Sequence, residues 1–347
     1  MIQTKSISRR HFFEKAALTA GLVALGSKNM FGKPSVLNRS QEKLPREVSI
    51  VTVSQDGLNA ESPEQVVQKF LTILEKSIIH RPDIVCLPEV VMFTWISQRL
   101  SLKEKADKSV ELMKEFMKFA LTNNCYIICP TVTFENGKLY NAAVVIDRKG
   151  NRMGEYRKMH LPLDELNSGY TPGPLLPPVF MTDFGTIGIQ ICYDCNWHDG
   201  WQSLRQQGAE IVFWPSAYPG GRVINARAFD NKYVVVTSTR GRSKICDISG
   251  DEIAQTHTAD ENRNLICATV NLEKVIVNSW PNAKNLKEIK DKYGEKVKIT
   301  SYEEEGWTII ESLAPDVRVN DLMKAYKMMS FKELSHETDV ISEKRRI

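Results

Sequence analysis

Short apolar runs alternate with amphipathic stretches along most of this chain. The apolar runs are rich in Val and Ile, as β-strands are, and polar or turn-forming residues bound them. Strands that alternate with helices predict an α/β layered domain. The predicted strands are Val48–Val53, Ile84–Leu87, Tyr126–Thr133, Ala142–Ile146, Ile187–Ile191, Ile211–Trp214, Tyr233–Thr237 and Leu265–Val270.

The clearest helix begins near Ser62. Ser62 can cap the first turn, Pro63 suits the first helical position, and Gln65 completes a capping box. One apolar stripe then recurs every four residues, at Val66, Phe70, Leu74 and Ile78.

A second helix is predicted over about 103–121. Val110, Met113, Met117 and Ala120 share one of its faces and are expected to be buried. Shorter helices are predicted at Gly200–Gln207 and Ile224–Asn231.

Two polar stretches resemble hairpin turns, Tyr140-Asn141 and Arg148–Asn151, so the sheets are expected to be mixed. After Glu273 the character changes, because Lys- and Glu-rich segments dominate and strands become sparse. We interpret residues 48–274 as the main domain. Residues 275–347, with an amphipathic stretch at Val319–Met329, form an extension expected to pack on the core or on another subunit.

The N-terminal segment has the features of an export signal. Arg9 and Arg10 precede Phe12 and a mildly apolar stretch, Ala16–Gly26, which is shorter than the roughly 20 residues of a spanning helix. The paired arginines resemble a twin-arginine signal. We therefore expect residues 1–33 to be a signal peptide, residues 34–47 a linker, and the protein to be periplasmic or in the cell envelope. The alternative is a surface helix with a basic end.

The composition narrows the class of protein. The chain has 347 residues, 42% hydrophobic and 25% charged, as in a soluble globular protein. Its net charge of +4 lies mainly in residues 1–33, whose net charge is +5, so the remainder carries 4 − 5 = −1. A near-neutral body does not favour nucleic-acid binding. No membrane span is expected beyond the signal segment, and few or no disulfides are expected among seven cysteines.

Three reactive side chains lie at predicted strand ends. Cys192 follows the apolar run Thr186–Ile191, Glu89 follows Ile84–Pro88, and Lys158 follows a predicted strand and turn. A thiol needs a base or a cation nearby to attack at neutral pH. A desolvated carboxylate can be that base, and a lysine can stabilise the oxyanion that forms. Together the three residues suit acyl transfer.

The same residues also allow a Cys–His pair, a redox or zinc-binding pair of cysteines, or ordinary structural roles. A Cys–His pair would need His160 or His198, and His198 is too near Cys192 in sequence to reach back easily. Cys192 and Cys195 could form a redox pair, but a second CxxC and metal-spaced histidines are absent, so zinc is not expected. Taken singly, Glu89 and Lys158 would be solvated surface charges, and Cys192 would be a core residue.

Five stretches, in this order, resemble the nitrilase superfamily of carbon–nitrogen hydrolases. They are Leu87–Glu89, Tyr156–Leu161, Gly188–Asp194, Gly208–Ala217 and Ala226–Val236. The resemblance implies an α-β-β-α sandwich with mixed sheets. It also implies Glu89 as general base, Cys192 as nucleophile and Lys158 beside the oxyanion, with the Tyr193 N–H as a second donor. Glu165 is the only glutamate between Lys158 and Cys192 and takes the role of the second glutamate.

The chain departs from the family pattern after Asp194, where Cys195–Asp199 replaces an Arg-aromatic-Pro-Glu run. Asp230 also stands where Glu is usual. Tyr193, Trp197 and His198 are therefore candidates for shaping the substrate pocket. His160, Arg227 and Asp194 are interpreted as structural residues.

The function expected from this resemblance is hydrolysis of a linear amide or N-carbamoyl compound through a cysteine thioester, releasing ammonia or an amine. The partner is a small amide-like molecule, no cofactor or metal is expected, and a homo-oligomer is expected. The alternatives are nitrile hydrolysis, acyl transfer to an amine acceptor, and a non-catalytic scaffolding member.

Overall fold

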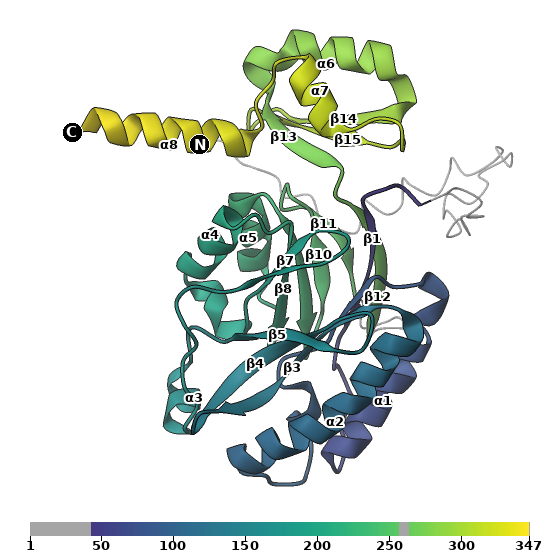
Figure 1. Ribbon diagram of the computed structural model, residues 1–347, viewed down its shortest axis with the longest axis vertical. Coiled ribbons are helices and arrows are strands. Elements are labelled where there is room, and N and C mark those ends of the chain that lie inside the picture. Colours follow the sequence, from purple (N-terminus) through teal and green to yellow (C-terminus); the bar gives the residue numbers. More distant parts are fainter. Residues whose placement is uncertain (1–42, 257–263, 347) are drawn as a thin grey trace, which may run out of the picture. The chain divides into compact units, whose positions relative to one another are not determined.

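A computed structural model describes residues 43–256 and 264–346. The main domain is built on two six-stranded sheets (Figure 1). The first has the order β12-β1-β2-β3-β4-β5, and the second β11-β10-β9-β8-β7-β6. In each sheet the three inner strands β1–β2–β3 or β7–β8–β9 are parallel and the flanking pairs are antiparallel, so the sheets are mixed as predicted.

The strands of the first sheet are β1 (Glu47–Val53), β2 (Ile84–Cys86), β3 (Tyr126–Glu135), β4 (Lys138–Ile146), β5 (Arg152–Arg157) and β12 (Leu265–Asn271). Those of the second are β6 (Val179–Met181), β7 (Thr186–Ile189), β8 (Ile211–Ser216), β9 (Val234–Thr239), β10 (Lys244–Cys246) and β11 (Glu252–Gln255). All eight predicted strands are present. The strands β5, β6, β10 and β11 were not predicted as defined runs; β6, β10 and β11 have only three or four residues, and β5 is rich in charged residues.

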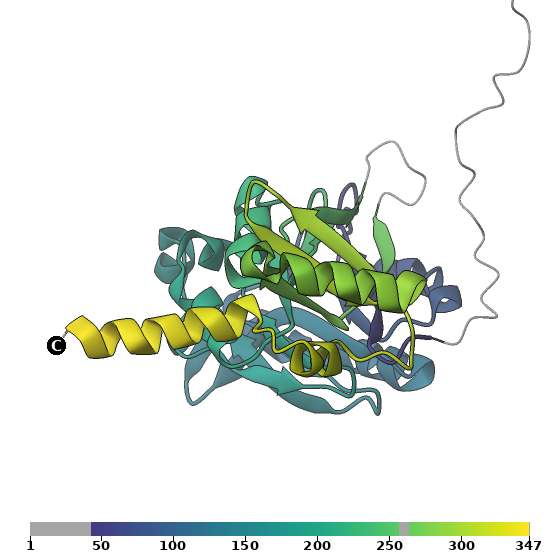
Figure 2. The same cartoon turned by 90° about the horizontal axis from the view of Figure 1, so that it is seen from above.

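Successive side chains of each strand point to opposite faces of its sheet, and this alternation builds the layers of the fold. In β2, Ile84 and Cys86 point into the core between the sheets, whereas Val85 points toward the helices on the outer face. Helices α1 (Pro63–Glu75) and α2 (Leu102–Asn123) cover the first sheet. Helices α4 (Asp199–Gln206) and α5 (Arg222–Asn231) cover the second (Figures 1 and 2). The predicted α-β-β-α sandwich is confirmed.

The helix predictions are confirmed except at single positions. Ser62 caps α1 as predicted, but Ile78 lies beyond the helix in the short helix η2 (Ile78–His80) and is 39% exposed. In α2, Val110 is 66% exposed, so its predicted burial was wrong. The buried face includes Leu112 and Phe116 instead, because the sheet contacts a face rotated from the stripe that the sequence suggested.

One turn prediction was also wrong. Tyr140 and Asn141 lie inside strand β4, and the β3–β4 turn is at Asn136-Gly137, where both residues have positive φ. Asn-Gly is a common two-residue hairpin turn for this reason. The predicted turn at 148–151 is confirmed between β4 and β5, with Gly150 N–H donating to the Asp147 carbonyl.

The C-terminal residues correct another prediction, because strands are not sparse there. β13 (Lys274–Asn278), β15 (Trp307–Ser312) and β14 (Val297–Tyr302) form an antiparallel sheet in that order. Helices α6 (Ser279–Tyr293) and α7 (Val319–Ala325) share a separate hydrophobic core with this sheet. Exposed Lys and Glu side chains on these strands dilute the apolar signal in the sequence. We call residues 274–325 the C-terminal layer.

Helix α8 (Phe331–Arg346) follows the C-terminal layer and buries none of its residues (Figure 2). The predicted signal segment lies outside the described residues. Within the described helices, none combines the length and apolar character needed to cross a membrane.

Candidate active site

The three predicted reactive residues each follow a strand of one of the two sheets. Glu89 comes three residues after the end of β2, and Lys158 follows β5 directly. Cys192 opens the short helix η4 (Cys192–Asn196), shortly after β7. The residues just beyond the carboxyl ends of parallel strands are a common place for active sites in α/β folds.

Lys158 joins two glutamates. Its Nζ donates to Glu89 Oε1 at 2.8 Å and to Glu165 Oε1 at 2.6 Å. The Lys158 side chain is fully buried and that of Glu89 is 3% exposed. Glu165 comes from the short helix α3 (Leu163–Asn167). The structure therefore brings Glu89, Lys158 and Glu165 together, although they come from three separate elements.

Asn141 is a fourth member of this cluster. Its Nδ2 donates to Glu89 Oε1 at 2.9 Å and to Glu165 Oε2 at 3.3 Å. Both hydrogen bonds to Glu89 thus reach Oε1, which leaves Oε2 for another proton donor. The sequence analysis missed Asn141 because its stretch was interpreted as a turn. The signal that could have identified it is a polar residue inside an apolar strand.

Burial and neighbouring charges shift the pKa values of these three residues. Burial alone raises the pKa of Glu89, but the Lys158 charge and hydrogen bond outweigh it, and the pKa lies below its usual range. Burial lowers the pKa of Lys158, but Glu89 and the other neighbouring acidic groups raise it above its ordinary value. Burial raises the pKa of Glu165, which Lys158 only partly offsets. At neutral pH, Glu89 is therefore a carboxylate and Lys158 a cation.

Cys192 is held in an unusual backbone conformation. Its φ is 46°, and Val90, next to Glu89, has a φ of 47°. Non-glycine residues in this left-handed region cost about 1–3 kcal/mol each and tend to cluster at functional sites. The thiol lies at the start of a turn, where the chain leaves the buried strand, and the residue is 8% exposed.

The Cys192 thiol is protonated in this resting arrangement. Burial and then the Glu89 charge raise its pKa to about 12, although Lys158, the Ala217 N–H and the Ser216 hydroxyl act in the opposite direction. Ser216 ends β8, the strand beside β7. These two residues lie within a stretch quoted for the family resemblance, but the sequence did not indicate their contact with Cys192.

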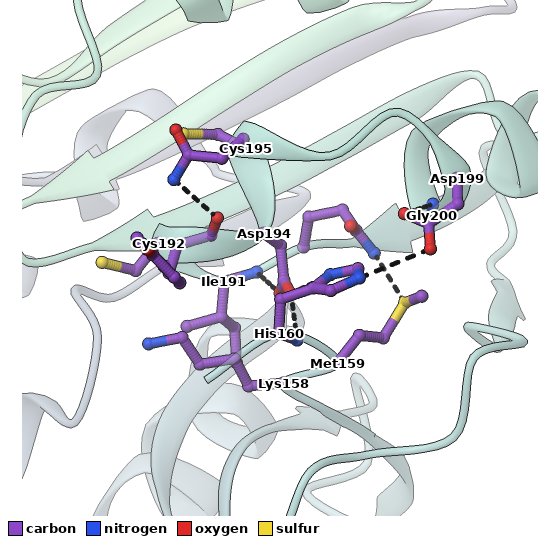
Figure 3. A network of polar contacts seen from close by, with 12 residues as sticks. Lys158, Met159, His160, Ile191, Cys192, Asp194, Cys195, Asp199 and Gly200 are labelled. Atoms are coloured by element: carbon purple, nitrogen blue, oxygen red, sulfur yellow. Dashed lines mark hydrogen bonds and ion pairs between the residues drawn. The ribbon is translucent and has the colours of Figure 1, made fainter. Parts of the chain in front are cut away.

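Asp194 fixes the turn that carries Cys192. Its Oδ2 accepts hydrogen bonds from the Tyr156 hydroxyl at 2.7 Å and from the Ile191 N–H at 2.8 Å, and its Oδ1 accepts from the His160 N–H at 2.8 Å. The network thus ties the Lys158 segment to the Cys192 turn. In Figure 3 the Lys158 amine and the Cys192 sulfur extend toward the same side, away from Asp199 and Gly200.

The three candidate substrate-binding residues lie on the turn after Cys192. Tyr193 and Trp197 are 37% and 38% exposed and contact each other edge to face at 5.0 Å between ring centroids. His160 stacks on Trp197 at 4.3 Å. His198 contacts Arg227 instead, with 2.6 Å between Nδ1 and the Arg227 Nη1. Tyr193 and Trp197 therefore present exposed rings beside the nucleophile, and their substrate contact stays a prediction.

The cysteines near the site bear on a possible redox pair or metal site. All seven cysteines are free, so Cys192 and Cys195 are not joined. Cys195 Sγ contacts the Tyr218 hydroxyl at 2.8 Å. In the part of the chain that the structure describes, no group of three or more His, Cys, Asp or Glu side chains is arranged to hold a metal ion.

Comparisons with known proteins agree with this fold. Residues 47–277 match the family model described as carbon-nitrogen hydrolase. A β-ureidopropionase of Arabidopsis thaliana is 29% identical over 60% of this chain, which spans 55% of that protein's length. A deaminated glutathione amidase of Synechocystis is 25% identical over 60% of this chain and 87% of its own.

A solved structure supports the fold. It is the amidase of Nesterenkonia sp. AN1, with the acetamide moiety of fluoroacetamide added covalently at the active site cysteine. It superposes with a TM-score of 0.57 at 14% identity, over 67% of this chain and 94% of the amidase.

Proposed function

Because this chain belongs to the carbon–nitrogen hydrolase family, we propose that it hydrolyses linear amides or N-carbamoyl compounds through a thioester on Cys192. The observation that supports this most is the buried contact of Lys158 with both Glu89 and Glu165, beside the Cys192 turn. A buried ion pair with a second, partly buried carboxyl group beside it is costly to a fold that uses these residues only for packing.

The first step is attack by Cys192. Glu89 is ionised and its Oε2 accepts no hydrogen bond within the described chain, so it can take the thiol proton as sulfur adds to the carbonyl carbon. A free thiolate need not form, because proton transfer accompanies attack. This suits a thiol whose pKa is raised to about 12.

The oxyanion that forms needs donors. Lys158 remains cationic because its acidic neighbours raise its pKa, and it supplies one. The Tyr193 N–H supplies the other, since it makes no hydrogen bond outside its own short helix within the described residues. The C–N bond then breaks, and the leaving ammonia or amine takes the proton from Glu89.

Deacylation completes the cycle. Water attacks the thioester carbon, and Glu89 or Glu165 takes its proton and passes it to the departing sulfur. The acid product is released and the free thiol is regenerated. Asn141 holds both carboxylates in place during this exchange. A mutant of the amidase from Nesterenkonia is consistent with a nucleophilic cysteine at this position of the fold, because its active site cysteine carries the covalently added acetamide moiety of fluoroacetamide.

The decisive experiment measures ammonia release from amides, N-carbamoyl amino acids, N-carbamoyl amines and nitriles, with mass spectrometry for an adduct on Cys192. We expect turnover of amides or carbamoyl compounds, and Cys192→Ala should remove both turnover and adduct. Cys267→Ala, a thiol of β12, is the control and should retain both. No turnover and no adduct across all classes would refute the hydrolase proposal. Product that forms only with an added amine acceptor would favour acyl transfer.

We further propose that the chain is exported through the twin-arginine route, on the basis of Arg9, Arg10, Phe12 and the apolar stretch that follows. The full chain should appear in the periplasm of a bacterium that has this route. Replacing both arginines by lysine should keep it in the cytoplasm. Equal export of the two forms would contradict the proposal.

A further inference from the structure

Unpaired polar atoms gather around the catalytic cluster. Five buried side-chain polar atoms of the described residues lack a hydrogen bond, and three of them are Gln55 Oε1, Asn141 Oδ1 and Arg240 Nε. Asn141 donates to Glu89 directly. Gln55 Nε2 donates to the carbonyl of Thr94, whose hydroxyl in turn contacts the Glu89 carbonyl at 3.5 Å. Buried polar groups normally have partners, so a concentration of unpaired ones points to an absent ligand.

Arg240 belongs to the same edge of the second sheet as Cys192. Strands β7, β8 and β9 are parallel neighbours. Cys192 follows β7, Ser216 ends β8, and Arg240 follows β9 directly. The Arg240 N–H donates to the Ser216 carbonyl at 3.2 Å, which places its backbone beside the residue whose hydroxyl acts on the Cys192 thiol.

Within residues 43–256 and 264–346, the Arg240 guanidinium has no carboxylate partner. None of the ion pairs or side-chain hydrogen bonds of the described residues includes it. Its charge reaches the site, since it adds to Lys158 in lowering the pKa of Glu89 against burial. Burial lowers the pKa of Lys105 in α2, and the Arg240 charge lowers it further.

Lys158 and Glu89 form a buried ion pair in this cluster. Arg240, whose charge acts on Glu89, takes part in none of the ion pairs of the described residues, and its Nε is buried without a hydrogen bond. A partly buried arginine without a counter-ion is unfavourable, and its planar fork matches a carboxylate with two parallel hydrogen bonds.

We propose that Arg240 binds a carboxylate of the substrate, so that the preferred substrates are amides or carbamoyl compounds that also carry a carboxylate. This rests on the proposed function and narrows its substrate class. The unpaired Gln55 and Asn141 oxygens are acceptors and suit the N–H groups of the amide or carbamoyl end. Arg240 is a specificity residue in this proposal and takes no part in the proton transfers.

The test compares matched substrates. Monoamides of dicarboxylic acids with two to four methylene groups are each paired with the amide that has methyl in place of the carboxylate. N-carbamoyl amino acids are paired with N-carbamoyl alkylamines in the same way. The wild type should prefer the acid of at least one pair by about tenfold or more in kcat/KM, because each tenfold corresponds to about 1.4 kcal/mol.

Three variants separate binding from structure. Arg240→Gln should lower kcat/KM on the acid substrate about 10- to 100-fold, mainly through KM, the size expected for a charge-assisted hydrogen bond, and should lower it on the neutral partner far less. Arg240→Lys should retain part of the preference. Arg242→Gln removes the same charge from an exposed residue two positions later and should have no effect.

The outcomes are distinguishable. Equal loss on acid and neutral substrates in Arg240→Gln would overturn the inference, as would a wild type that prefers the neutral member of every pair. In either case turnover of neutral amides with a Cys192 adduct would leave the proposed function standing. If Arg240→Gln fails to fold, competitive inhibition of the wild type by simple alkanoates supports the inference, and its absence overturns it.

Discussion

At the scale of single residues, the pKa values of two glutamates that contact the same lysine shift in opposite directions. Glu89 is more deeply buried than Glu165, yet its pKa is lowered, because burial is outweighed by Lys158, Arg240 and Asn141. Burial dominates at Glu165 and raises its pKa, and the Glu89 charge adds to that. A proton that enters the cluster as pH falls therefore goes to Glu165 first, which keeps Glu89 available as a base.

This predicts the acid side of the pH profile. Since Glu89 takes the thiol proton, kcat/KM should fall only as pH drops below 4.5, the ordinary value of its pKa. Glu89→Gln should lower kcat by about 10²- to 10⁴-fold, the usual contribution of a general base. Glu165→Gln should leave the acid limb where it is. An acid limb above pH 4.5 that disappears in Glu165→Gln would instead assign the base to Glu165.

The same shifts affect stability, which the pH series must monitor by circular dichroism. A carboxyl group with a lowered folded pKa stabilises the fold above its ordinary pKa and loses that contribution as pH falls through the folded pKa. Glu89 follows this rule below pH 4.5. Glu165, whose folded pKa is raised, destabilises the fold above pH 4.5, and this penalty is absent below that pH.

At the scale of elements, α1 and α2 differ in how completely their N-terminal residues cap the first turn. Ser101 and Glu104 form a complete capping box at α2, in which each side chain binds the other's backbone N–H. At α1 the Ser62 hydroxyl accepts from the Gln65 N–H at 3.4 Å, but the Gln65 side chain accepts from Glu61 rather than from Ser62. The predicted capping box at Ser62 is therefore only half formed.

Ser101→Ala should accordingly destabilise the protein by about 1 kcal/mol, the usual cost of losing an N-cap. Ser62→Ala should cost less, because its single hydrogen bond is long. Urea unfolding of the two variants beside the wild type measures both values. Equal losses, or a larger loss for Ser62→Ala, would contradict this ranking.

At the scale of the whole described molecule, an aromatic cluster joins the C-terminal layer to the main domain. Trp307 of β15 contacts Phe229 of α5 edge to face at 5.1 Å and stacks with Phe331 of α8 at 6.2 Å. Lys232 Nζ lies 3.5 Å from the centre of the Trp307 ring. Polar contacts add to this cluster, since the Tyr302 hydroxyl donates to Asp251 and Lys274 pairs with Asp247, both at 2.6 Å.

Trp307→Ala should therefore destabilise the protein by about 3–5 kcal/mol, as large-to-small changes of buried aromatics do. The matched control is Trp280→Ala, since Trp280 in α6 is 83% exposed and Trp307 is 4% exposed. The control should stay within about 0.5 kcal/mol of the wild type. Thermal unfolding measures both, and similar losses in the two variants would show that the aromatic cluster does not hold the C-terminal layer.

The sequence alone determined eight of the twelve strands of the sandwich and placed Glu89, Lys158 and Cys192 at strand ends, because residue periodicity and motif spacing are properties of the chain itself. It could not show that Asn141 lies within a strand beside Glu89, or that Glu165 contacts Lys158. Those contacts join side chains that are not neighbours in sequence. Only the tertiary structure decided the directions of the pKa shifts, because burial and neighbouring charge act through space.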